Sequence, residues 1–239
     1  MDIKLRSQPD SAIGSASDAY ASIAHITLGE QENIYAQAGC MVAMSADIEA
    51  DTTLRRGKGG GIWGGIKRMV AGESLFLSQF TCTSEEGEIF LAPKLIGDVM
   101  AYQLSGNELV VQAASYLASS ENVDLDVGFQ GLKSFFSGES IFWLSLSGYG
   151  TAILTSFGGI YAIPVDGEYI VDTGHIVAFE KSLDFKVTKA GSSWIGSLLG
   201  IGGEGLVCRF EGQGKVYCQT HNNGAFGHLV GSQLPPRQE

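Results

Sequence analysis

The chain contains the same two short patterns three times, always in the same order. The first pattern is a Gly-Glu pair that precedes apolar residues, and its copies begin at the nearly evenly spaced Gly72, Gly138 and Gly203. The second reads IYAQAGCMVAMSADIEA from Ile34, VVQAASYLASSENVDLD from Val110 and IVDTGHIVAFEKSLDFK from Ile170. Two patterns that recur in one order indicate a supersecondary unit used three times. This predicts pseudo-threefold symmetry, with the three glycines superposing about one axis.

Between these patterns the sequence reads as strands. Apolar and polar residues alternate over 123–127, 183–187 and 48–51, which is the period of a strand with one face inward. Segments 109–113 and 169–171 are rich in β-branched residues. The sequence therefore predicts an all-β fold in which most of the chain forms strands.

Two three-residue segments that begin and end with glycine are expected to be hairpin loops. Gly148-Tyr149-Gly150 separates FWLSL from TAILT, and Gly212-Gln213-Gly214 separates LVCRF from KVYCQ. The second loop would place Cys208 opposite Cys218, as small buried thiols. A disulfide between them is geometrically feasible but is disfavoured in a reducing compartment.

The length of 239 residues is compatible with a single all-β domain. The polar residues at the start predict a loose arm, and LPPRQE at the end predicts a tail. The expected organisation is an arm at 1–21, one domain at 22–230 with repeats at about 30–105, 106–166 and 167–226, and a tail at 231–239.

Charge and hydropathy narrow the class of protein. The formal net charge of −11 opposes nucleic-acid binding, because phosphate backbones are repelled. No apolar run approaches the roughly 18 residues of a membrane span, and the first residues contain no apolar signal core. The four cysteines form no C-x-x-C pair. A cytoplasmic location is the expectation.

Three segments together resemble a known family. They are AGCMVAM from Ala38, KRMVAGESLF from Lys67 and GEIFLAP from Gly87. Over about Ile23 to Phe226 the chain resembles the altered-inheritance-of-mitochondria family of mitochondrial biogenesis. The resemblance implies a double-stranded β-helix-like or β-prism-like barrel, grouped with the tryptophan RNA-binding attenuation protein, and a trimer-like arrangement. Mitochondrial members are linked to inner-membrane organisation, and the family offers no established catalytic residues to carry over.

One glycine-flanked insert per repeat interrupts the strands: GGGIWGGIKRMVA, GFQGLKSFFS and GSSWIGSLLGIG. Their bulky apolar residues either pack inward as lids on the core or project outward as a patch with basic neighbours. An outward patch would bind a protein or a membrane surface. The candidate binding residues are Trp63, Lys67, Arg68, Lys133, Phe135, Phe136 and Trp194, with Trp63 the first choice.

Other motifs give little support for catalysis. His25, His175, His221 and His228 show no metal-ligand spacing, so neither a metal nor a cofactor is expected. Gly57-Lys58-Gly59 lacks the Ser or Thr of a phosphate loop. The repeated Glu73, Glu139 and Glu204 could serve as catalytic carboxylates, but strand-start glutamates after turn glycines are the favoured interpretation.

The leading hypothesis is a non-enzymatic β-scaffold that self-associates, with a trimer favoured, and binds a protein or a peripheral membrane partner through its inserts. The alternative is a small-ligand binder or enzyme that uses the interior of a cupin-like β-helix. RNA binding is a third hypothesis, which the negative charge opposes. The first two differ in what fills the interior: apolar side chains for the scaffold, a polar cavity for the ligand binder.

Overall fold

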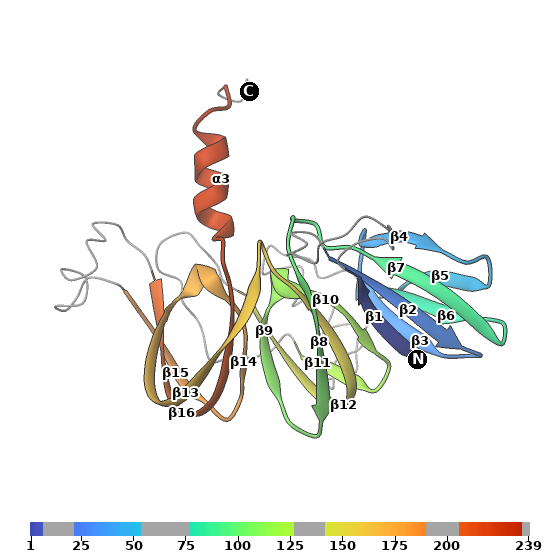
Figure 1. The fold of residues 1–239 in the computed structure, drawn as a ribbon, viewed down its shortest axis with the longest axis horizontal. Coiled ribbons are helices and arrows are strands. Elements are labelled where there is room, and N and C mark those ends of the chain that lie inside the picture. Colours follow the sequence, from blue (N-terminus) through green and yellow to red (C-terminus); the bar gives the residue numbers. More distant parts are fainter. Residues whose placement is uncertain (7–21, 54–76, 127–141, 190–205, 236–239) are drawn as a thin grey trace, which may run out of the picture.

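The computed structural model describes residues 1–6, 22–53, 77–126, 142–189 and 206–235 (Figure 1). Strands make up most of the described chain, so the predicted all-β class is confirmed. The first strands are β1 (Asp2–Arg6), β2 (Ile23–Gly29), β3 (Asn33–Gln37), β4 (Met41–Met44), β5 (Ile48–Thr53), β6 (Leu77–Cys82) and β7 (Glu86–Leu91). The middle strands are β8 (Val99–Ser105), β9 (Leu109–Gln112), β10 (Tyr116–Ser120), β11 (Val123–Asp126) and β12 (Trp143–Thr155). The last elements are β13 (Ile160–Asp172), β14 (Ile176–Glu180), β15 (Asp184–Lys189), β16 (Leu206–Gln219) and helix α3 (Asn223–Gly231), and short 3₁₀ turns precede β10 and β14.

The strands form three units with the same pairing. Unit 1 (residues 23–91) contains the antiparallel triplets β2–β7–β4 and β3–β6–β5. Unit 2 (residues 99–155) contains β8–β12–β10 and β9–β12–β11, with β12 running through both triplets. Unit 3 (residues 160–219) repeats this with β13–β16–β14 and β13–β16–β15. Each unit therefore contains two small antiparallel sheets. In units 2 and 3 the two sheets share one long central strand, whereas in unit 1 the central strands are β7 and β6.

A register shift marks the same place in each unit. The third strand of the first triplet is irregular just before Ala43 in β4, Ala118 in β10 and Ala178 in β14. With these alanines aligned, the pairing of the units matches Ile34 with Leu109. The sequence pattern, which matched Ile34 with Val110, is therefore out of register by one position. The two alignments differ because the register is set by which residues pair across the strands, and a comparison of the sequence alone does not contain that pairing.

Neighbouring units are joined by edge pairing. Strand β10 of unit 2 pairs with β3 of unit 1, and β14 of unit 3 pairs with β9 of unit 2. The units consequently lie in a row, with unit 3 and unit 1 at opposite ends (Figure 1). No pairing among the described strands joins unit 3 back to unit 1, and the expected threefold axis stays a prediction. The three glycines chosen for that superposition lie outside the described residues.

Both expected glycine hairpins are wrong, because β12 and β16 are continuous strands of 13 and 14 residues. Residues 143–148 of β12 pair with β9 and β11, whereas residues 149–155 pair with β8. Gly148 lies where the strand passes from one sheet to the other. Its φ of +104° and the carbonyl oxygen of Asn122, which a Cβ would overlap, both require glycine. The glycines mark a bend rather than a reversal.

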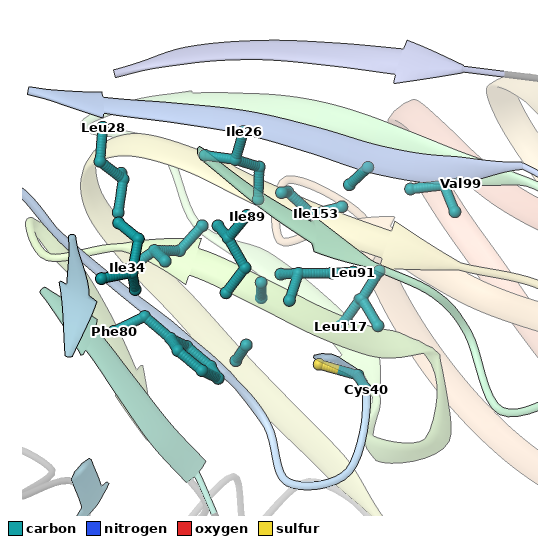
Figure 2. Close-up of a cluster of buried hydrophobic side chains, with 14 of the residues drawn as sticks. Ile26, Leu28, Ile34, Cys40, Phe80, Ile89, Leu91, Val99, Leu117 and Ile153 are labelled. Carbon is teal, nitrogen blue, oxygen red and sulfur yellow. The ribbon is translucent and has the colours of Figure 1, made fainter. Parts of the chain in front are cut away.

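Each core is completed by the unit that follows it. The first core gathers apolar side chains of both sheets of unit 1, and Val99, Leu117, Ala118 and Ile153 of unit 2 close it (Figure 2). The second core belongs to unit 2 and is closed by Val177, Ala178 and Tyr217 of unit 3. The third core, in unit 3, receives no side chain from a following unit among the described residues. The row thus begins and ends differently.

The two ends of the chain are more ordered than the sequence indicates. Asp2–Arg6 pairs with β2 as an added edge strand, so the prediction of a loose arm is wrong there. Near the other end, the Asn222 side chain accepts a hydrogen bond from the Ala225 amide at 3.0 Å and caps helix α3. The helix has no buried residue and projects away from the sheets (Figure 1). The sequence pattern did not predict this helix.

Candidate binding face

The seven candidate binding residues of the inserts lie outside the described residues. The same is true of Glu73, Glu139 and Glu204 and of the basic stretch from Arg55 to Arg68. What the structure does place is the pair of strands on either side of each insert. The site is therefore built from those strands, from the interior of the units, and from the exposed edges.

The three inserts connect equivalent strands. Residues 54–76 join β5 to β6, residues 127–141 lie between β11 and β12, and residues 190–205 join β15 to β16. In each case the two strands are antiparallel neighbours that pair beside the insert, as Thr53 with Leu77 and Lys189 with Leu206. Each unit therefore carries its insert at the same corner.

Apolar side chains fill the interior of the units. Tyr116, Phe179, Phe210 and Leu109 are all fully buried in the second and third cores. Tyr116 satisfies its hydroxyl with the Ser119 hydroxyl at 2.9 Å. This filling favours the scaffold over a cupin-like ligand binder, because the described interior is packed rather than lined with convergent polar groups.

The thiols are buried, as predicted, and all four cysteines are free. Burial raises the pKa of Cys208 to about 12 and that of Cys218 to about 11. Cys40 is similar, with burial raising its pKa to about 11. Since a thiol must ionise to act as a nucleophile, these three are structural at neutral pH. Cys208 pairs across the strands with Val171 and Val187, not with Cys218 as a hairpin would require.

An open hollow of about 480 Å³ lies where units 2 and 3 meet. It is lined by Asn107, Glu108, Glu180, Lys181 and Ser182. The Glu180 carboxylate already accepts a hydrogen bond from the Lys215 amide at 3.0 Å and lies 3.5 Å from the Tyr102 hydroxyl. Burial first, and then the charge of Glu180, raise the pKa of Tyr102. The Glu180 carboxylate in this hollow therefore already has partners from both units, Tyr102 of unit 2 and Lys215 of unit 3.

The described histidines make local contacts. His25 Nε2 lies 2.8 Å from a Glu88 oxygen, and the ring stacks on Phe90 with centroids 4.3 Å apart. His175 Nδ1 lies 2.8 Å from the Gln219 carbonyl oxygen, and His221 Nδ1 lies 2.8 Å from the Thr220 hydroxyl. In the part of the chain that the structure describes, no three His, Cys, Asp or Glu residues are grouped to hold a metal ion.

Sequence reasoning missed an exposed apolar edge. Strand β4 presents Met41, Val42 and Met44 to solvent, and Val42 is 59% exposed. Its equivalents in the other units, Leu117 and Val177, are 0% exposed. The repeated sequence pattern contained a signal for this edge, because Val42, Leu117 and Val177 align once the register is known. Only the structure shows that two of them are covered and one is not.

These features define an all-β protein with a packed interior, three inserts that lie between equivalent strands, and an exposed apolar edge strand. Among the described helices, none is long and apolar enough to cross a membrane. The family model for mitochondrial biogenesis AIM24 matches residues 16–221. The chain therefore belongs to the AIM24 family, as the sequence resemblance indicated.

Two Streptococcus pyogenes proteins are similar to the chain. The uncharacterized protein M6_Spy0233 of serotype M6 is 31% identical over 221 residues, which cover 89% of this chain and 87% of that protein. The crystal structure of protein SPYM3_0169 is 26% identical and superposes with a TM-score of 0.70, covering 97% of this chain and all of that one. The likeness extends over all three units.

Proposed function

We propose that this protein is a non-enzymatic β-scaffold that self-associates and binds a protein or a membrane surface through its three inserts. The observation that carries the proposal is the equivalence of the insert positions on a packed core. Three hairpins of the same kind hold the inserts, while apolar side chains fill the units beneath them. On such scaffolds, binding residues are concentrated in the connecting loops.

The composition of the inserts favours a membrane surface or an acidic partner. Trp63 lies shortly before Lys67 and Arg68 in a chain whose net charge is −11. Burial of a large aromatic side chain contributes about 2–3 kcal/mol. Each basic residue near an anionic bilayer adds about 1 kcal/mol. Together these terms support weak, reversible and salt-sensitive binding.

The same proposal extends to organisation and location. We place the chain in the cytoplasm, where its four free thiols suit a reducing environment. We also retain a single domain at 22–230 with repeats at about 30–105, 106–166 and 167–226. These boundaries differ from the ends of the paired units, since β8 lies in the first of these repeats and the boundary at 166/167 falls within β13.

Flotation with anionic liposomes at low and high salt tests the insert hypothesis. We expect the native chain to float at low salt, and Trp63→Ser and the double variant Lys67→Glu plus Arg68→Glu to lose flotation. The matched control is Lys186→Glu plus Lys215→Glu, which makes the same charge change on β15 and β16. If the native chain never floats, the membrane version is wrong and a protein partner, sought by affinity capture, is what remains. If the control loses flotation equally, net charge rather than the insert explains the binding.

A further inference from the structure

We propose that copies of this chain join head to tail, with strand β4 of one copy pairing with the end of β13 of the next. The inference deepens the self-association in the proposed function by naming its surface, and it rests on that part of the proposal alone. It does not depend on what the inserts bind. The argument comes from the two junctions that the chain already contains.

The internal junctions share one register. At the first, Ala118, Ser119 and Ser120 pair with Ala36, Tyr35 and Ile34. At the second, Ala178, Phe179 and Glu180 pair with Val111, Val110 and Leu109. Both junctions are antiparallel. In each, the third strand of a unit's first triplet (β10 or β14) pairs with the first strand of the second triplet in the preceding unit (β3 or β9). The fold therefore has one way of adding a unit, and it uses that way twice.

Strand β4 is the equivalent of these joining strands, and none of the described strands pairs with its second edge. By register, Val42 corresponds to Leu117 and Val177, and Ala43 corresponds to Ala118 and Ala178. At the internal junctions these side chains lie in the core of the neighbouring unit. In β4 they are exposed, and among the described strands β4 pairs only with β7. A row of apolar side chains beside an unpaired strand edge is a site for edge pairing.

At the other end of the row, none of the described strands pairs as a joining strand. Residues 169–172 of β13 correspond to 34–37 of β3 and 109–112 of β9, each of which receives a joining strand. Tyr169 is 44% exposed, whereas Ile34 and Leu109 are 0% exposed. Over the described residues, β13 pairs only with β16.

The third core shows what is missing. The first core takes four buried apolar residues from the following unit and the second takes three, whereas the third takes none among the described residues. The equivalents that a second copy would supply are Val42, Ala43 and Phe90. Phe185, which borders the third core, is only partly buried, although its equivalent Leu125 is 3% exposed. The edge that lacks a partner and the core that lacks side chains thus complement each other.

The two edges require a second copy because they lie at opposite ends of one molecule (Figure 1). The internal register predicts Ala43 opposite Val171, Met44 opposite Ile170, and Ser45 opposite Tyr169. Such an interface uses two different surfaces and is heterologous. It therefore builds a closed ring, of which a trimer is one case, or an open chain.

The test is the mass in solution, by light scattering and sedimentation, of two variants and two controls. Val42→Glu blocks the β4 edge, and Tyr169→Glu blocks the β13 edge. Both side chains are well exposed, so each variant should fold, as circular dichroism and thermal melting will verify. We expect each to raise the dissociation constant at least about tenfold, since a charge would be buried at the junction. Ile96→Glu and Tyr149→Glu, at exposed positions on neither edge, should leave the association unchanged.

Mixing the two variants separates this interface from its rivals. Each variant retains one intact edge, so an equimolar mixture should form a dimer that cannot grow, while either variant alone stays monomeric. A symmetric β4–β4 interface would instead leave Tyr169→Glu associated, and that result would overturn the proposal. A native chain that stays monomeric at high concentration would overturn both this interface and self-association, without bearing on flotation. Association that neither variant weakens would overturn only this interface.

Discussion

Strands β10 and β4 have the same position in their units but opposite environments. β10 lies between two units, and its Leu117 completes the core of unit 1. β4 lies at the end of the row, and its Val42 faces solvent. The sequence makes the two strands alike, because both carry apolar residues around the same register shift. The difference teaches that a neighbour, not the strand itself, decides whether these side chains are buried.

The largest expected effect comes from truncating the two equivalent side chains. Leu117→Ala should lower the free energy of unfolding by about 2–5 kcal/mol, because it opens a cavity in a closed core. Val42→Ala should change it by no more than about 0.5 kcal/mol in the dissociated chain, because its site is exposed. Chemical denaturation at low protein concentration measures both. Equal losses would mean that β4 is already covered within a single chain.

A second pair of substitutions compares the bend at Gly148 in β12 with the open position of Gly167 within β13. Gly148 and Gly167 have nearly the same backbone, with φ of +104° and +101°. A Cβ at Gly148 meets the Asn122 carbonyl, whereas at Gly167 it meets nothing within 4 Å. Gly167→Ala should therefore cost only backbone strain, about 1–2 kcal/mol. Gly148→Ala should lower the free energy of unfolding further, and an equal cost would show that the close approach relaxes freely.

The thiols provide a smaller and more local comparison. Cys40 precedes the open strand β4, whereas Cys208 and Cys218 lie in the core of unit 3. At pH 8 these three thiols of the native chain should react slowly with a disulfide reagent, because burial raises their pKa values to about 11 to 12. In Val42→Glu, Cys40 should react first, through local opening of the edge. Mass spectrometry of the labelled peptides gives the order, and faster labelling of Cys218 would contradict it.

The same pKa shifts predict how stability depends on pH. In the unfolded chain these thiols lose their protons around their ordinary pKa of 9.0, earlier than in the folded chain. The unfolded state therefore binds fewer protons between about pH 9 and 12, and stability should fall as pH rises through that window. Cys208→Ala should make the fall less steep. A slope unchanged by that variant would assign the pH dependence to other groups.

Much of the fold was predictable because strands leave a local signature. Alternation at 123–127 and 183–187 located β11 and β15, and the repeated pattern located the joining strands. The hairpins at Gly148 and Gly212 were wrong because a glycine that bends a continuous strand has the same sequence appearance as one that reverses it. Which side of the bend pairs with which strand is a long-range property, and no local pattern encodes it.

The candidate site was also predictable only in part: the inserts could be found from the sequence, whereas the exposed edge could not. The inserts were visible as interruptions of the strand pattern, and the structure shows that the strands beside them are equivalent. The β4 edge was not recognised, because Met41, Val42 and Met44 look like any half-buried strand until their neighbours are known. The misplaced register at Val110 had the same origin. Sliding a strand by a single position exchanges its two faces, and only the pairing fixes it.

A disulfide trap tests the central claim most directly. A double variant, Ala43→Cys with Val171→Cys, places one thiol at each of the two edges, at positions whose equivalents pair as Ala118 with Ala36 and Ala178 with Val111. Mild oxidation followed by non-reducing electrophoresis and peptide mapping should show a 43–171 bond between copies, because paired strand positions bring the Cβ atoms within about 4.5–5.5 Å. The control, Ala43→Cys with Glu168→Cys, is out of register and should cross-link poorly. A 43–171 bond within single chains, a 43–43 dimer, or no cross-link where the native chain is associated would contradict the head-to-tail junction.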